Sequence, residues 1–324
     1  MSTAFWARWL RHRVIEMSVF LGIDTSNYTT SAALFDNESG RTLSERKLLA
    51  VAEGSLGLRQ SDALFLHTKQ LPEIIEKLLA GFDGKICAVG ASTRPRSQQD
   101  SYMPCFLAGE SLAKSISEVL RVKCTPFSHQ DGHIAAALFS CGRTDLFEKR
   151  FIAFHLSGGT TEAVLAQPDG NGFKCEVVAR SLDLKLGQAI DRVGKLLGLP
   201  FPSGKYIDEL AQAAKPSSSV KVRLKGADCC VSGVENQCRK LLNYGESKET
   251  VARYVVEFAC ETVEKMTEKL VEQYRDIPIV FAGGVSSNTI IRNNLSKRFN
   301  TYFASPQLSS DNAVGIAVLA SRCL

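Results

Sequence analysis

The sequence predicts an α/β protein with two lobes. Stretches of β-rich apolar residues alternate with stretches of helical periodicity from Ser18 onward, which is typical of layered α/β proteins. The 324 residues, 44% hydrophobic and 23% charged, suffice for two lobes of about 150 residues with their own cores. A strand–turn–strand pattern opens the chain and recurs near its middle, which indicates a distant internal duplication.

The first half opens with a hairpin-like pair of strands joined by the polar turn 25–30. A helix follows with Pro72 near its start, where the missing N–H of proline is not needed. Another strand and an amphipathic helix complete this half. The predicted strands are 19–24, 31–36 and 86–91, and the predicted helices are 71–79 and 107–120.

The second half begins in the same way, with a Gly-rich turn at 157–161 between two strands. Residues 216–219 are interpreted as a surface loop, because Pro and Ser dominate them. Regular elements then continue to the end of the chain. The predicted strands are 151–156, 162–166 and 279–282, and the predicted helices are 191–197, 251–274 and 313–323.

The start of the chain is predicted to lie outside the fold. Residues 1–16 hold both tryptophans but no apolar stretch of the length that a secretory signal needs. A clear strand pattern begins after Met17, so residues 1–16 are interpreted as a non-native or disordered extension, with a short targeting segment as the alternative. No stretch approaches the ~18 apolar residues of a membrane span.

Charge and cysteine content restrict the class of protein only broadly. Lysine and arginine number 39 against 34 acidic residues, an excess that suits a nucleic-acid partner and equally an ordinary, slightly basic enzyme. Ten cysteines occur without a repeated C-x-x-C spacing, which argues against a zinc finger. We therefore expect mostly reduced thiols in a cytoplasmic protein.

Three strands lead into polar or glycine-rich turns that could hold a phosphorylated ligand. These turns are 22–27, 156–161 and 281–288, and adjacent backbone amides in such turns form a concavity for anions. The third turn precedes a helix whose N-terminus favours phosphate, with Asn288 on its first turn. Each turn alone is more often structural, and Asn288, Ser286 or Ser287 could simply cap that helix.

Two histidines are spaced as metal ligands on a helix. His129 and His133 stand at i and i+4, so they share one helical face. A third ligand must come from elsewhere, and Asp311 opens the final predicted helix. The alternatives are a pair of polar surface histidines and, for Asp311, a helix cap.

These motifs, in this order, resemble the TsaD family (also called Gcp or YgjD), once classified as M22 glycoproteases. The similarity runs from about Met17 to the C-terminus. The family's H-x-x-G-H, S-G-G, G-E-A-F-D-K, Y-P-G-G, G-G-V-x-x-N and D-N motifs are represented by residues 129–133, 157–159, 187–192, 201–204, 283–288 and 311–312.

The resemblance implies the two-lobed actin-like ATPase fold (ASKHA, ribonuclease H-like), with a ligand cleft between the lobes. The N-terminal lobe is expected to comprise 17–127 and 305–324, and the C-terminal lobe 128–304. The implied activity is transfer of a threonylcarbamoyl group from threonylcarbamoyl-AMP to N6 of adenosine in tRNA. The implied partners are tRNA and TsaB- or TsaE-like proteins, with no membrane and no DNA.

The resemblance also assigns site residues. One divalent metal, Fe²⁺ or Zn²⁺, is expected on His129, His133 and Asp311. An adenine nucleotide (ATP, AMP or threonylcarbamoyl-AMP) is expected on His155, Leu156, Ser157, Gly158, Gly159, Asp191, Gly204 and Asn288.

The chain departs from the family beside the expected reaction centre. Tyr28 and Thr29 replace an acidic pair, residues 94–99 replace a Gly-Pro-Gly loop, and Thr160 replaces a frequent histidine. Asp24 and Asp131 remain as candidate catalytic acids. The departures predict a divergent paralogue with weak transfer by the isolated chain; the alternative function is a nucleotide- and metal-binding regulatory or assembly subunit. A metallopeptidase is disfavoured, since no glutamate stands between the histidines.

Overall fold

The computed structural model describes residues 18–26, 28–50, 58–98, 100–216, 220–305 and 312–324. The chain divides into two compact units, each described here by itself. Unit 1 comprises Met1–Phe139, Pro168–Lys174 and Ser310–Leu324, and unit 2 comprises Ser140–Gln167 and Cys175–Ser309. The extension predicted at 1–16 lies outside the described residues, as does most of the loop predicted at 216–219.

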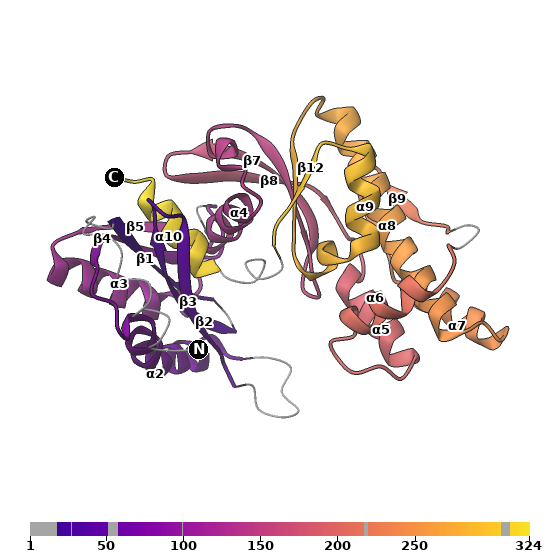
Figure 1. Cartoon of the computed structure of the whole chain (residues 1–324), viewed down its shortest axis with the longest axis horizontal. Coiled ribbons are helices and arrows are strands. Elements are labelled where there is room, and N and C mark those ends of the chain that lie inside the picture. The colour runs from indigo at the N-terminus through magenta and orange to yellow at the C-terminus, as the bar shows by residue number, and fades with distance from the viewer. Residues whose placement is uncertain (1–17, 27, 51–57, 99, 217–219, 306–311) are drawn as a thin grey trace. The chain divides into compact units, whose positions relative to one another are not determined.

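Unit 1 is built on a five-stranded sheet with helices on both faces (Figure 1). The strand order is β3-β2-β1-β4-β5, antiparallel from β1 to β3 and parallel from β1 to β5. The strands are β1 (Ser18–Thr25), β2 (Thr29–Asp36), β3 (Arg41–Leu48), β4 (Lys85–Arg94) and β5 (Lys123–Ser128), and the helices are α2 (Gln60–Leu79), α3 (Phe106–Leu120), α4 (His129–Ser140) and α10 (Asn312–Ser321).

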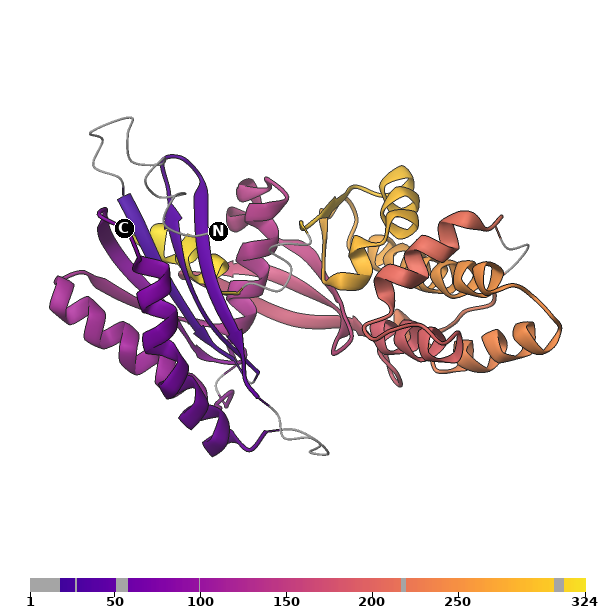
Figure 2. The same cartoon turned by 60° about the horizontal axis from the view of Figure 1, so that its bottom comes forward.

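The central strand β1 is buried on both faces because helices cover each of them. Val19, Leu21 and Ile23 point to one face and join the core formed with α2 and α3. Gly22 points to the other face, where a Cβ would lie 2.2 Å from the Ala313 carbonyl oxygen of α10. The alternation of side chains along a strand therefore places Asp24 on the same face as α10. Figure 2 shows α10, the yellow helix at the C-terminal end of the chain, beside the strands of unit 1.

Unit 2 contains a second five-stranded sheet of the same topology. Its order, β12-β11-β6-β7-β8, corresponds strand by strand to β5-β4-β1-β2-β3, with β6 and β7 antiparallel and β6, β11 and β12 parallel. This correspondence confirms the predicted duplication at the level of topology. The strands are β6 (Phe151–Leu156), β7 (Thr161–Asp169), β8 (Gly172–Arg180), β11 (Ile279–Ala282) and β12 (Thr301–Phe303).

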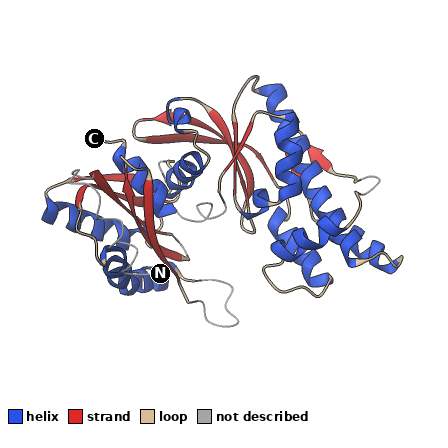
Figure 3. Cartoon of the chain, in the orientation of Figure 1, coloured by secondary structure: helices blue, strands red, loops and turns tan. Residues whose placement is uncertain are grey.

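The helices of unit 2 pack on one face of this sheet around a single large core (Figure 3). Strand residues such as Phe154 and Phe281 meet helix residues such as Val193, Val255 and Met266 there. The helices are α5 (Leu186–Leu196), α6 (Gly204–Ala213), α7 (Gly233–Asn243), α8 (Lys248–Gln273) and α9 (Thr289–Arg298), with a small hairpin of β9 (Arg223–Lys225) and β10 (Asp228–Cys230) and two 3-10 turns, η1 (Thr144–Glu148) and η2 (Gly284–Ser287).

The predicted start of the first helix, at residue 71, is wrong. That helix, α2, begins at Gln60, so Pro72 lies inside it. Its first half was missed because its buried face there consists of Ala63 and His67, which give little hydrophobic periodicity.

Helix α4 groups with unit 1 by its contacts. The lobe boundaries expected from the resemblance placed residues 128–304, and so this helix, in the C-terminal lobe.

Two further findings concern the class of protein. All ten cysteines lie within the described residues, and none forms a disulfide. Among the described helices, none combines the length and the apolar character that a membrane crossing requires.

Candidate functional site

Four separate elements of unit 1 bring polar side chains to one edge of its sheet. Asp24 lies near the end of β1 and Ser92 in β4, and these strands are parallel neighbours with Ile23 opposite Ala91. His129 begins α4 directly after β5, and Asn312 begins α10. Because the carboxyl ends of parallel strands meet at one edge of a sheet, residues far apart in sequence converge there.

Close packing of two helices positions this cluster. A Cβ on Gly315 of α10 would lie 1.9 Å from the Gly132 carbonyl oxygen of α4, and a Cβ on Gly132 would lie 3.0 Å from the Asn312 carbonyl oxygen. Glycine at both positions therefore lets the backbones of α4 and α10 approach. The glycine within the H-x-x-G-H motif thus brings the start of α10 to the histidines.

Asp24 is the buried centre of the cluster, with 1% of its surface exposed. Its Oδ1 lies 2.9 Å from Nδ1 of His129 and also accepts a hydrogen bond from the Ser92 hydroxyl. Burial alone would raise the pKa of Asp24, but the charge of His129 and hydrogen bonds from His129 and Ser92 outweigh it. The net effect is a pKa below the usual value, so the carboxylate is ionised at neutral pH.

The two histidines lie together, as their spacing predicted. Their ring centroids are 4.6 Å apart, with the rings nearly perpendicular. The Asn312 amide nitrogen lies 3.2 Å from Nδ1 and 3.3 Å from Nε2 of His129. Asp311 falls outside the described residues, and among those described no three His, Cys, Asp or Glu side chains form a metal-binding group.

Two buried oxygen atoms indicate that the cluster can accept a cation. Oδ2 of Asp24 and Oδ1 of Asn312 are acceptors with no hydrogen-bond donor among the described residues. Buried acceptors without donors are costly and are usually satisfied by water or an ion. Imidazole and carboxylate donors suit Fe²⁺ or Zn²⁺, so the residues present fit the metal that the sequence predicted.

Asp131, the other candidate acid, is engaged within the protein. It is 2% exposed. Its Oδ2 accepts from the backbone N–H and hydroxyl of Ser128 and from the Ser97 hydroxyl, and its Oδ1 accepts from the Phe173 N–H. These bonds hold the start of α4 and the 168–174 segment in place.

The residues that replace the acidic pair lie close to Asp24 in the chain. Tyr28 is 43% exposed and its carbonyl oxygen accepts from the Leu49 N–H. Thr29 begins β2, and its carbonyl oxygen accepts from the Ser26 hydroxyl. Neither side chain is a base near neutral pH.

Unit 2 contains a pocket of about 470 Å³ that unites most of the predicted nucleotide residues. Its lining is mostly apolar, and its polar groups come from four segments that are distant in sequence. The lining residues are Ser157, Gly158, Gly187, Ile190, Asp191, Pro202, Gly204, Lys205, Ile207, Asp208, Val256, Gly284, Val285, Ser287 and Asn288. His155, Leu156 and Gly159 were predicted to bind the same ligand but are not among these lining residues.

Asp191 and Asn288 each have a structural role besides lining the pocket. Oδ1 of Asp191 accepts from the Ser203 N–H at 2.8 Å and so holds the turn before α6. Oδ1 of Asn288 caps α9 by accepting from Ile290 and Ile291. Of the capping residues considered from the sequence, Asn288 caps α9.

Sequence reasoning missed Asp208 and Lys205 in this pocket. Asp208 accepts a hydrogen bond of 2.8 Å from the Asn288 amide nitrogen. It follows Gly204 by one helical turn, so the i, i+4 spacing from a predicted site residue was the available signal. Lys205 is the residue directly after Gly204 and brings a positive charge to the pocket.

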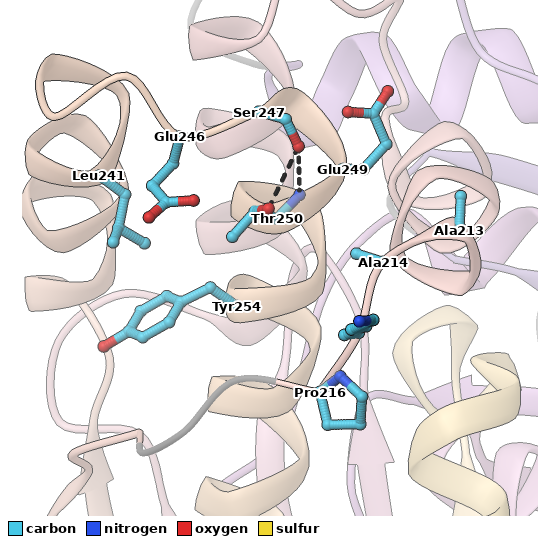
Figure 4. Close-up of a pocket in the computed structure, with 10 residues that line it drawn as sticks. Ala213, Ala214, Pro216, Leu241, Glu246, Ser247, Glu249, Thr250 and Tyr254 are labelled. Carbon is cyan, nitrogen blue, oxygen red and sulfur yellow. Dashed lines mark hydrogen bonds between the residues drawn. The ribbon is translucent and has the colours of Figure 1, made fainter.

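A second hollow in unit 2 holds none of the predicted residues. It measures about 600 Å³ and lies where α6 and α7 end and α8 begins. Figure 4 shows that the Ser247 hydroxyl there faces Thr250. The hydroxyl oxygen accepts a hydrogen bond from the Thr250 N–H and so caps the N-terminus of α8.

Comparison with solved structures identifies the fold. The chain matches full-length HypF in its phosphate- and nucleotide-bound form with a TM-score of 0.55 at 14% identity, over 96% of this chain and 56% of HypF. It matches a putative N-acetylmannosamine kinase from Listeria monocytogenes with a TM-score of 0.52 at 8% identity, over 94% of this chain and all of the kinase. These likenesses confirm the predicted actin-like ATPase fold.

Comparison with sequences identifies the family. The chain is 26% identical to the tRNA N6-adenosine threonylcarbamoyltransferase of Riemerella anatipestifer, over 94% of this chain and 93% of that enzyme. It is 28% identical to that of Carboxydothermus hydrogenoformans, over 92% of this chain and 90% of the other. Residues 61–318 match the model of the family as a whole, and the chain therefore belongs to the tRNA N6-adenosine threonylcarbamoyltransferase (TsaD) family of acyltransferases.

Proposed function

We propose that the chain transfers a threonylcarbamoyl group from threonylcarbamoyl-AMP to N6 of adenosine in tRNA. Family membership supports this reaction and gives no support to the alternative of a regulatory or assembly subunit. The nucleotide portion of the donor is assigned to the pocket of unit 2. A divalent metal, Fe²⁺ or Zn²⁺, is assigned to His129, His133 and Asp311.

The assignment of a nucleotide to this pocket rests on the free space around three of its glycines. A Cβ on Gly158, Gly204 or Gly284 would meet no atom within 4 Å. Packing within the protein therefore does not require glycine at these positions, although glycine costs conformational entropy on folding. Close approach of a ligand to the backbone explains all three.

The remaining pocket residues match the parts of an adenine nucleotide. Ile190, Ile207 and Val256 form an apolar surface that suits the base. Asp191 and Asp208 are acceptors for ribose hydroxyls, because a carboxylate pairs well with a vicinal diol. The Ser157–Gly158 turn and the N-terminus of α6 suit phosphate.

The reaction exchanges one bond to the threonylcarbamoyl carbonyl carbon for another. The N6 amine attacks that carbon, the new C–N bond forms, the bond from carbon to the phosphate oxygen breaks, and AMP leaves with the electron pair. The amine loses one proton to a base or to water. When bound, the metal would supply positive charge for a phosphate or carbonyl oxygen.

The test uses the purified chain with threonylcarbamoyl-AMP and unmodified tRNA, alone and together with TsaB- and TsaE-like proteins. Nucleosides from the digested tRNA are analysed by mass spectrometry. We expect threonylcarbamoyladenosine to form with the partners present and to form slowly without them, since Tyr28 and Thr29 cannot act as bases. No product under either condition would overturn the proposal, and fast transfer by the chain alone would overturn the role given to the lost acids.

A further inference from the structure

We propose that Asp24 is a positioning residue of the metal site and does not contact substrate. It acts through His129: its carboxylate accepts the Nδ1–H of the imidazole and thereby leaves Nε2 as the metal-binding nitrogen. This inference rests on the metal site of the proposed function. It goes beyond that site because the ligand set His129, His133 and Asp311 assigns Asp24 no part.

Burial excludes Asp24 from direct chemistry. With 1% of its surface exposed, the carboxylate cannot reach a tRNA base. Its Oδ1 nevertheless lies 2.9 Å from Nδ1 of His129, a normal length for a charge-assisted hydrogen bond. A carboxylate oxygen is an acceptor, and this one already accepts from the Ser92 hydroxyl, so we assign Nδ1 of His129 as the donor.

The position of Asp24 fixes the tautomer of His129. A neutral imidazole carries one proton, so a protonated Nδ1 leaves a lone pair on Nε2. The Asn312 amide nitrogen lies 3.2 Å from Nδ1 and 3.3 Å from Nε2, so this contact does not choose between the tautomers, and the assignment rests on the contact with Asp24. Ligating histidines usually donate their other N–H to a carboxylate in this way, and loss of such a partner weakens metal binding by ~10–100-fold.

Ser92 and the α4–α10 packing keep the pair in place. The Ser92 hydroxyl donates to the same Oδ1 and fixes the carboxylate from the neighbouring strand. Asp24 itself stands on β1, the central strand, and His129 on the first turn of α4. A carboxylate on a rigid central strand can therefore orient an imidazole that stands 22% exposed at the edge of the sheet.

The first experiment compares Asp24→Asn with a matched control, Asp36→Asn. Asp36 is also buried, at 3% exposure, and lies at the far end of the same hairpin, opposite Val19. The affinity of each metal-free full-length protein for Zn²⁺ and Co²⁺ is measured by competition with a coloured chelator. We expect D24N to bind ~10–100-fold more weakly and D36N to bind within about twofold of the parent.

A double-mutant cycle separates positioning from a merely structural role. If Asp24 acts through His129, D24N should change the affinity by less than about twofold in an H129A background, where binding is already weak. Nitrogen-15 NMR of the metal-free protein provides a second readout. We expect His129 to carry its proton on Nδ1 in the parent and to show a mixed tautomer in D24N.

Several results would overturn the proposal, and they are distinguishable. If the parent binds one metal and H129A loses it while D24N binds like the parent, Asp24 has no role but the metal site stands. An equal loss from D24N with and without His129 would make Asp24 a ligand or a purely structural residue. If the parent binds no metal, or H129A binds as well as the parent, the proposed metal site fails and the role of Asp24 fails with it.

Discussion

Asp24 in unit 1 is almost inaccessible at 1% exposure, whereas Asp208 in unit 2 lines a pocket of about 470 Å³. Both are carboxylates hydrogen-bonded to a residue of the predicted site. Asp24 bonds His129 and Ser92, and Asp208 bonds Asn288. The first arrangement leaves one buried acceptor, Oδ2 of Asp24, without a donor among the described residues, and the second leaves room for a ligand with several functional groups.

The glycines of the two regions show the same difference. A Cβ on Gly315 or Gly132 would collide with or press on neighbouring backbone, whereas Cβ atoms on Gly158, Gly204 and Gly284 would extend into open space. At these positions glycine serves close packing in unit 1 and leaves open space in unit 2, where the proposed function places a ligand. The same residue type in two motifs of one family has two physical roles, and the sequence alone does not distinguish them.

Removing a metal ligand should have the largest effect and should be confined to unit 1. We expect His133→Ala and Asp311→Ala each to reduce bound metal from about one per chain to under a tenth. A direct ligand contributes more to metal affinity than its hydrogen-bond partner does, and loss of such a partner costs ~10–100-fold. Metal content by mass spectrometry is the measurement, and binding of AMP serves as the internal control. Full metal content in both variants would contradict the ligand set.

Alanine substitutions at glycines should separate packing from access. We expect Gly315→Ala to lower the free energy of unfolding by about 3 kcal/mol and Gly132→Ala by about 1–3 kcal/mol, because overpacking displaces the α4–α10 backbones. Gly204→Ala should change it by less than about 0.5 kcal/mol. Urea titration of the three variants gives the comparison. Equal stability of Gly315→Ala and Gly204→Ala would show that the close approach of α4 and α10 is not required.

The interior strands and the Gly-rich turns of the fold were predictable because they leave local signals, whereas the edge strands β3, β5, β8 and β12 were not predicted. β6 and β11 were predicted with the observed bounds. The first half of α2 was not, because Ala63 and His67 form its buried face. Helices α6 and α7 were also missed; their buried residues are few, as with Val234 and Cys238 on α7.

The candidate site was predictable only in part, for a related reason. His129 and His133 share one helix, so their spacing is visible in the sequence. The hydrogen bond from His129 to Asp24 spans 105 positions, and the one from Asn288 to Asp208 spans 80. Such contacts depend on strand order and helix packing, which no local pattern records.

Neutralising the pocket carboxylates should have a smaller effect, confined to unit 2. We expect Asp208→Asn and Asp191→Asn each to weaken AMP binding by about tenfold, since a neutral acceptor replaces a charged one. Asn at 208 can still accept from Asn288, so the pocket should persist. Calorimetry with AMP is the measurement, with Asp228→Asn, outside the pocket, as the control. Unchanged affinity in both pocket variants would remove the carboxylates from the ribose site.

The smallest expected effect concerns His67, a buried histidine of unit 1 in neither site. Its Nδ1 lies 2.7 Å from the Thr30 hydroxyl, and burial lowers its pKa below the usual 6.5. Above pH 6.5 the residue is neutral in both folded and unfolded chains. As pH falls below 6.5, the unfolded chain takes up a proton that the folded chain resists, so stability falls until the pH reaches the lowered pKa.

His67→Asn should therefore flatten the pH dependence of stability between pH 7.5 and 5.5. The slope that one histidine can contribute is at most about 1.4 kcal/mol per pH unit. Asn can donate to the Thr30 hydroxyl in place of the Nδ1–H of His67, so the fold should persist.

Urea titrations at pH 7.5, 6.5 and 5.5 in the presence of a chelator measure the effect. Carboxylates with lowered pKa values, such as Asp24, lose their contribution only at lower pH. A variant whose stability falls as steeply as that of the parent would place the titrating group elsewhere.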